Sequence, residues 1–120
     1  MTNSRRKGAK GELEIAKILR DYGWKAHRAQ QYKGSKDSAD VICELPIPLY
    51  VEVKRREKLE LYKWMEVCNS ERGPDDLPVI FHRKDKEKWL CTLRLSDFLD
   101  LVKFVEQLLD GQRVYSITLE

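Results

Sequence analysis

Apolar residues recur every three or four positions near both ends of the chain, and they alternate or cluster in its middle. The first spacing is typical of amphipathic helices, whereas alternation and short apolar runs are typical of strands. Helices are predicted over residues 7–22, 57–70 and 96–109. Gly23 and Gly111 are the expected ends of the first and last helices, and Ser96 is the expected amino-terminal cap of the last.

Five stretches between the first and last helices have the composition and periodicity of strands. They cover residues 24–32, 39–45, 49–55, 77–83 and 88–95. Residues 33–38 have the composition of a loop, and residues 112–120 form a tail with no assigned element. The order α-β-β-β-α-β-β-α predicts an α/β (α+β) fold in which a mixed central sheet is flanked by helices, in a single domain over residues 1–120.

The second and third predicted strands are joined by a short segment with two prolines, and a three-residue turn there gives a hairpin register. In that register Val41 faces Val53, and one side of the strand pair is entirely apolar. On the other side Asp40 lies opposite Lys54, with Glu52 on the diagonal, because alternate residues of a strand share a face. The hydrophobic pattern therefore brings three ionisable groups together.

Two carboxylates this close repel each other unless a proton or a cation lies between them. Magnesium takes oxygen ligands and keeps several waters, so Asp40 and Glu52 form a candidate metal site. Glu12 on the first helix could add a third carboxylate. Water on such an ion is a nucleophile near neutral pH, and Lys54 could stabilise charge on a phosphate or orient that water. The alternative is an ordinary cross-strand ion pair on the solvated face of a sheet.

The net charge of +3 is unevenly distributed along the chain. Residues 1–36 contain ten Lys and Arg against three Asp and Glu, whereas residues 37–120 contain thirteen against seventeen. A basic end predicts a polyanionic partner such as nucleic acid, and the alternative is a flexible basic arm over residues 1–7. The candidate DNA contacts are Arg5, Arg6, Lys7, Lys10, Lys33, Ser35, Lys36, Arg55 and Arg56. Of the last two, one is expected to face solvent and the other to pair with Glu57 or Glu60.

Other residues with reactive or aromatic side chains are assigned to structure. The cysteines, Cys43, Cys68 and Cys91, have no disulfide or zinc spacing and are expected to be reduced thiols of a cytoplasmic protein. His27 and His82 are expected to make local hydrogen bonds. Packing is the expected role of Trp64, Trp89, Phe98 and Phe104. No apolar run approaches the ~18 residues that cross a bilayer, so no membrane association is predicted.

Asp40, eleven intervening residues and then Glu52-Val53-Lys54 resemble the D…(D/E)xK signature of the PD-(D/E)xK nuclease superfamily. The opening RRKGAKGELEIAKIL is similar to the first helix of archaeal-type Holliday junction resolvases, in which a helical Glu contributes to the metal site. GSKDSADV, YVEVKRRE and the later LPVIFHRKDKEKWLCTLRLSDFLDL resemble small phage-encoded endonucleases of this group. The resemblance covers roughly residues 5–105, and Ala39 stands where the signature has a proline.

The resemblance implies a magnesium-dependent DNA endonuclease with a restriction-endonuclease-like core, in which Mn²⁺ can replace Mg²⁺. Asp40, Glu52 and Glu12 would bind the metal, and Lys54 would act at the phosphate to complete the catalytic set. The resemblance further implies a homodimer that cleaves branched DNA in recombination and needs no small-molecule cofactor. It would be a phage-encoded enzyme of the bacterial cytoplasm.

Two other functions stay open at this point. A nuclease with the same chemistry could act on linear, nicked or single-stranded DNA, because the signature does not specify the target. A module with the same fold could bind nucleic acid without hydrolysis. The carboxylates argue against this second alternative, because a protein that only binds nucleic acid gains nothing from negative charge beside the phosphates, which it would repel.

Overall fold

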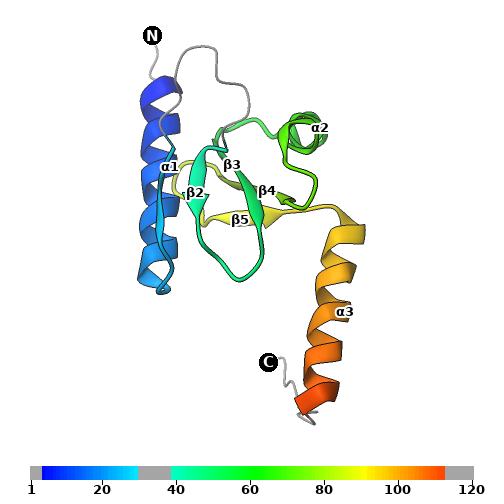
Figure 1. Cartoon of the computed structure of the whole chain (residues 1–120). Helices are drawn as coiled ribbons and strands as arrows, with labels where there is room; N and C mark the ends of the chain where they lie inside the picture. Colours follow the sequence, from blue (N-terminus) through cyan, green and yellow to red (C-terminus); the bar gives the residue numbers. More distant parts are fainter. Residues whose placement is uncertain (1–3, 30–38, 113–120) are drawn as a thin grey trace.

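The computed structural model describes residues 4–29 and 39–112 of the chain. Figure 1 shows its elements, which in chain order are α1 (Ser4–Asp21), β1 (Ala26–Arg28), β2 (Val41–Cys43), β3 (Leu49–Arg55), α2 (Leu61–Glu71), β4 (Leu77–Arg83), β5 (Leu90–Thr92) and α3 (Leu95–Gln112). The order of helices and strands is the predicted one, and β3 and β4 have the predicted bounds.

The first helix begins earlier than its apolar pattern indicates. α1 starts at Ser4, so residues 4–7 of the expected basic arm are helical. α2, in contrast, starts at Leu61, four residues after the predicted start. The predicted loop over residues 33–38 and the tail over residues 113–120 lie outside the described part of the chain.

The two predicted boundaries of the last helix are wrong. α3 begins at Leu95, so Ser96 lies inside the first turn instead of capping it. The backbone carbonyl of Arg94 accepts the N–H of Phe98 at 3.0 Å and so makes the first helical hydrogen bond. Gly111 also lies within α3, because glycine is permitted inside a helix at a modest cost in free energy.

The five strands form one sheet with the order β1-β2-β3-β4-β5. β3 and β4 run parallel, and the other three neighbouring pairs are antiparallel. α1 packs along β1, β2 and β3, while α2 packs against β3 and β4. Alternate residues of β3 contact the two helices, so α1 and α2 cover opposite faces of the sheet (Figure 1). This architecture confirms the predicted mixed sheet flanked by helices and is consistent with a restriction-endonuclease-like core.

The main core lies between α1 and the central strands. Ile15 and Ala16 of α1 pack against Val51 and Val53 of β3, and all four are buried. Gly11 permits this close approach, because a Cβ there would lie 3.0 Å from Cγ of Arg55 and 3.3 Å from Cγ1 of Val53. The short distance between α1 and β3 matters for function, since it brings the next residue of α1 to the sheet.

The register between β2 and β3 differs from the prediction by two residues. Val41 pairs with Val51 and not with Val53. The connection over residues 44–48 is longer than the assumed turn, and Pro46 and Pro48 have no N–H to extend the ladder. A shift of two keeps every side chain on its predicted face, because the side-chain period of a strand is two residues.

The last helix is largely separate from the rest of the molecule. α3 leaves the body beside α2 and extends away from the sheet (Figure 1). Phe98 and Phe104 are 50% and 53% exposed, so they do not pack in the core of this chain, whereas Trp64 is buried as predicted. Within the described residues, no helix has the length and hydrophobicity required to span a bilayer.

Candidate active site

Asp40 stands directly before β2, and both its backbone and its side chain bind to β3. Its N–H donates to the carbonyl of Val51 at 2.8 Å, and its Oδ2 accepts the N–H of Val53 at 2.8 Å. These contacts hold the carboxylate beside Glu52, which lies between the two valines. Asp40 is only 8% exposed, so its carboxylate has a fixed position at the sheet.

Glu52 and Lys54 share the face of β3 that also carries Tyr50. Nζ of Lys54 lies 3.7 Å from Oε1 of Glu52 and 5.8 Å from the centre of the Trp64 ring on α2. The structure therefore brings Asp40, Glu52 and Lys54 together. It places Asp40 beside Glu52, which corrects the predicted pairing of Asp40 with Lys54.

The electrostatics of Glu52 are unusual for a carboxylate next to a lysine. Burial raises the pKa of Glu52 from 4.5 to about 7, and the negative charge of Asp40 adds to the rise. Lys54 acts in the opposite direction but does not cancel these two effects. A poorly solvated carboxylate that its neighbouring lysine does not fully compensate favours the uptake of a proton or a cation.

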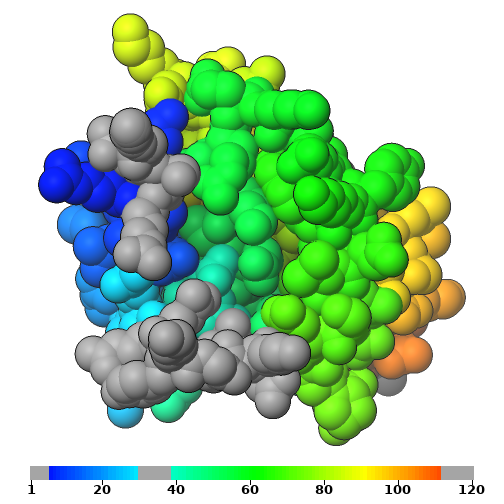
Figure 2. All heavy atoms as spheres, turned by 90° about the horizontal axis from the view of Figure 1, so that it is seen from above, coloured from blue at the N-terminus to red at the C-terminus, as the bar shows by residue number. Residues whose placement is uncertain are grey.

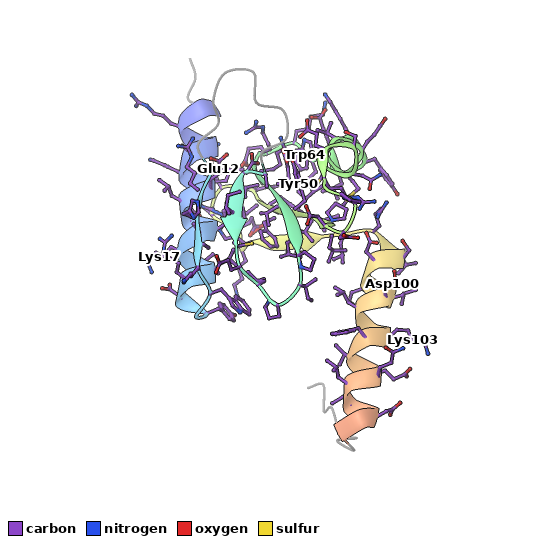
Figure 3. The ribbon with its side chains drawn as sticks, viewed as in Figure 1. Glu12, Lys17, Tyr50, Trp64, Asp100 and Lys103 are labelled. Atoms are coloured by element: carbon purple, nitrogen blue, oxygen red, sulfur yellow. The ribbon has the colours of Figure 1, made fainter. Side chains whose placement is uncertain are left out.

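Glu12 reaches the same region from α1. Figure 3 shows Glu12, Tyr50 and Trp64 at the same end of the molecule, whereas Lys17 lies further along α1 on its outer side. Partial burial raises the pKa of the Glu12 carboxyl above its ordinary value, although a hydrogen bond from Arg28 acts against it. The charges of Asp40 and Lys54 also act on Glu12.

The partner of Glu12 is a residue that sequence reasoning missed. Nε of Arg28, the last residue of β1, donates to Oε1 of Glu12 at 2.5 Å. No sequence signal distinguishes Arg28 from a solvated arginine at a strand end. Because Arg28 already binds this carboxylate, a cation could bind Glu12 only by replacing Arg28.

The fit of this site to a metal ion rests on its oxygen donors. The described residues contain no group of three Asp, Glu, His or Cys side chains arranged to hold a metal. Asp40 and Glu52 nevertheless offer adjacent carboxylates, and a hard divalent cation that keeps several waters needs only one or two of these. Asp40 and Glu52 therefore fit such a cation as a two-carboxylate site, with Glu12 near by.

The surface is hollowed between the two helices that flank the sheet. In the view from above, a depression runs between α1 and α2, and atoms of β2 and β3 form its floor (Figure 2). Glu12 of α1 and Tyr50 of β3 lie at this end of the molecule (Figure 3). The side chains of Lys54 and Glu52 are 22% and 14% exposed, so both are partly open to solvent.

A second, basic hollow of about 630 Å³ opens where α1 begins. It is lined by Arg6, Lys7, Lys10, Arg55, Arg83, Asp85 and Lys86. Arg83 and Lys86, from β4 and the turn after it, were not among the predicted DNA contacts. Asp85 accepts Nζ of Lys7 at 3.0 Å and Nη2 of Arg55 at 3.0 Å. A carboxylate therefore occupies a place between two cations where a phosphate oxygen could bind in its stead.

Glu14 of α1 binds two of the arginines that line this hollow, and the sequence analysis did not predict its role. It accepts Nη1 of Arg55 at 3.2 Å, Nη2 of Arg83 at 3.1 Å and Nε1 of Trp89 at 3.0 Å. Partial burial opposes the ionisation of Glu14, but the bonds from Arg83 and Trp89 outweigh it and lower the pKa. The available signal was its position beside Ile15 on the sheet-facing side of the helix.

The two arginines that end β3 have different environments. Arg56 is exposed, as expected of one of the pair. Arg55 pairs with Glu14 and Asp85 instead of Glu57 or Glu60, and its side chain is 13% exposed. Residues Lys33, Ser35 and Lys36 and the side chain of Arg5 lie outside the described part of the chain.

His82 agrees with its assignment to structure. Nε2 of the buried His82 lies 2.7 Å from Oγ1 of Thr92, which confirms the predicted local hydrogen bond. Burial lowers the pKa of His82. His27 is exposed on β1.

Comparison with known protein families gives one match. Residues 3–118 match the family described as "Phage putative PDDEXK endonuclease". This range contains every described element and all the residues of the candidate site. No curated protein matches the chain.

Proposed function

Because the chain belongs to this family of phage PDDEXK endonucleases, we propose that it hydrolyses DNA phosphodiester bonds with Mg²⁺, for which Mn²⁺ can substitute. The supporting observation is the position of Asp40, whose carboxylate is held against β3 beside a Glu52 with a pKa of about 7. In a fully compensated ion pair the pKa of the carboxyl falls, whereas here it rises. Lys54 therefore does not fully compensate the charge of Glu52, and a divalent cation would supply further positive charge.

Each residue of the site has a role in this proposal. Asp40 and Glu52 hold the cation, which when bound supplies Lewis-acid charge beside the scissile phosphate. Lys54 stabilises negative charge that develops on the phosphate, or orients the attacking water. Glu12 is the auxiliary carboxylate. Hydrolysis joins the water oxygen to phosphorus and breaks one phosphorus–oxygen ester bond, and the leaving oxygen gains a proton.

The DNA backbone is proposed to follow the basic surface from the depression to the basic hollow. Lys7, Lys10 and Arg6 contribute from α1, and Lys86 contributes from the turn after β4. Such contacts bind any sequence, since they neutralise phosphates. Arg55 is mainly a support for this surface, because it is already bound to Glu14 and Asp85.

Lys10→Ala is expected to weaken duplex binding about 3- to 10-fold at low salt and to reduce the salt slope by about one. Fluorescence anisotropy in EDTA at several salt concentrations measures both quantities. Lys17→Ala is the matched control, because Lys17 lies two turns further along α1 and pairs with Asp21. Equal effects of the two substitutions would contradict the assignment of the hollow to DNA.

Branched DNA is the proposed substrate, and a homodimer is the proposed assembly. The support is the similarity of the α1 sequence to the first helix of archaeal-type Holliday junction resolvases. Cleavage of two opposed strands at a junction requires two active sites, which a two-fold dimer provides. The proposed setting is recombination of phage DNA in the bacterial cytoplasm.

The test of this function is a cleavage assay with the full chain. A four-way junction and a linear duplex of the same arm sequence are incubated with Mg²⁺, Mn²⁺, Ca²⁺ or EDTA. Nicking is expected with Mg²⁺ and Mn²⁺ and not with EDTA, because two carboxylates alone have no Lewis acid to offer. The junction is expected to be cut at least about tenfold faster, a difference of about 1.4 kcal/mol in transition-state free energy.

Each contrary result has a distinct meaning. Cutting in EDTA would exclude the metal site. Equal cutting of junction and duplex would favour a nuclease for linear DNA. Tight binding without cutting under any condition would favour the non-catalytic binding module.

A further inference from the structure

α3 exposes far more apolar surface than a helix of a monomeric domain usually does. Among the described elements, no helix or strand makes extensive contact with it. Seven large apolar side chains of α3 are between 44% and 72% exposed, and they are Leu95, Phe98, Leu99, Val102, Phe104, Val105 and Leu108. Together they present on the order of several hundred Å², which exceeds the scattered apolar exposure normal for a monomer.

Part of this exposed set is ordered along the helix. Leu95, Phe98, Val102 and Val105, followed by the half-buried Leu109, stand at alternating spacings of three and four. This spacing forms a straight seam on a helix, of the kind that packs against a second helix. α3 has 18 residues and is therefore about 27 Å long, enough for a seam of five layers.

A second stripe lies next to this seam. Leu101 and Phe104 line a hollow of about 330 Å³ beside Pro46, Pro48 and Leu77 at one end of the sheet. The apolar face of α3 is therefore wider than a simple two-helix seam. A partner that covers it must fill both the seam and this hollow.

The charges of α3 disfavour nucleic acid as its partner. Asp97, Asp100, Glu106 and Asp110 stand against the single Lys103 in the helix. Figure 3 shows Asp100 and Lys103 along α3, well away from Glu12. A helix with this net negative charge repels DNA phosphates, so its apolar seam faces protein.

We infer that α3 is the dimerisation helix of the protein and that its seam packs against the seam of a second copy. The inference rests on the two-fold assembly proposed above and supplies its surface. In a two-fold interface the same patch occurs on both subunits, and a continuous seam on one helix satisfies that requirement. The exposed apolar area is comparable with the ~800 Å² per partner of a standard stable interface. Val102, the central residue, meets its own copy whether the helices run parallel or antiparallel.

The test compares the mass of the wild type and Val102→Glu in solution by size-exclusion chromatography with light scattering. The wild type is expected at twice the mass of one chain and Val102→Glu at the mass of one chain, because two buried carboxylates would meet at the two-fold axis. Gln107→Glu, on the polar side of α3, is the matched control and is expected to stay dimeric. Circular dichroism checks that helix content is retained.

Val102→Cys keeps the test decisive if Val102→Glu does not fold. Oxidised Val102→Cys is expected to run as a cross-linked dimer in non-reducing gels. Gln107→Cys is the control for the position of the new cysteine, and the wild type is the control for cross-linking through the three native cysteines. A monomeric wild type at about 50 µM, or a Val102→Glu variant that stays dimeric, would overturn the inference. Absence of the Val102→Cys cross-link would do the same. All measurements are made in EDTA without DNA, so a failure here is distinct from a failure of the nuclease assay.

Discussion

Asp40→Asn is expected to lower DNA cleavage at least about 100-fold, because loss even of a residue that supports a metal ligand commonly costs 10- to 100-fold. The fold should survive, since the Asn side-chain oxygen can still accept the N–H of Val53. DNA binding should be unchanged or slightly tighter, because one negative charge near the phosphate is removed. Cleavage is measured in Mg²⁺ on the preferred substrate, and binding is measured in EDTA.

The control for Asp40→Asn is Asp21→Asn, at the exposed end of α1, where the carboxylate pairs with Lys17. That variant should cleave DNA like the wild type. If Asp40→Asn cleaves equally well, Asp40 is not a ligand and the two-carboxylate site is wrong. If it neither binds nor cleaves, unfolding measurements separate a lost fold from a lost site.

Glu52→Gln is expected to abolish cleavage and yet stabilise the metal-free protein. The raised pKa means that the folded chain holds the Glu52 proton more tightly than the unfolded chain does. Between pH 4.5 and about 7 the unfolded state therefore binds fewer protons, and stability falls as the pH rises. At about pH 8 the wild type carries the full penalty, on the order of 2–3 kcal/mol, which a neutral glutamine removes.

Urea unfolding in EDTA at about pH 8 and about pH 4 measures this effect, since the linear dependence on urea gives the free energy of unfolding. The gain should be large at the higher pH and close to zero at the lower pH, where Glu52 is protonated in both states. Glu66→Gln on the exposed side of α2 is the matched control and should stay within about 0.5 kcal/mol of the wild type. A Glu52→Gln protein that is less stable at the higher pH would show that Lys54 already compensates the carboxylate.

The candidate site was predictable because it depends only on which residues share a face of the strand, and not on which residues pair across the two strands. The assumed turn placed Val41 opposite Val53, and the structure pairs Val41 with Val51. A shift of one residue would have scattered Asp40 and Glu52 to different faces, but a shift of two leaves them together. The prolines that invalidated the turn could not disturb the alternation.

The missed residues share a physical reason. Arg28, Glu14 and Arg83 are charged residues whose importance lies in contacts far along the chain, such as Arg83 with Glu14. Local periodicity carries no information on such contacts. The exposed face of α3 was misread for a related reason, because an apolar stripe looks the same whether it meets its own sheet or another chain.

The bonds of Glu14 have a consequence for how DNA is recognised. Arg55 and Arg83 are bound to one carboxylate of α1, and α1 also carries Glu12. The basic hollow and the candidate site are thereby linked through the same helix. Part of the side-chain entropy of Arg55 and Arg83 is therefore lost before a substrate binds, and under the proposed function we expect the duplex to adapt to this surface. Selectivity would then reflect the deformability of the nucleic acid more than any adjustment of the enzyme.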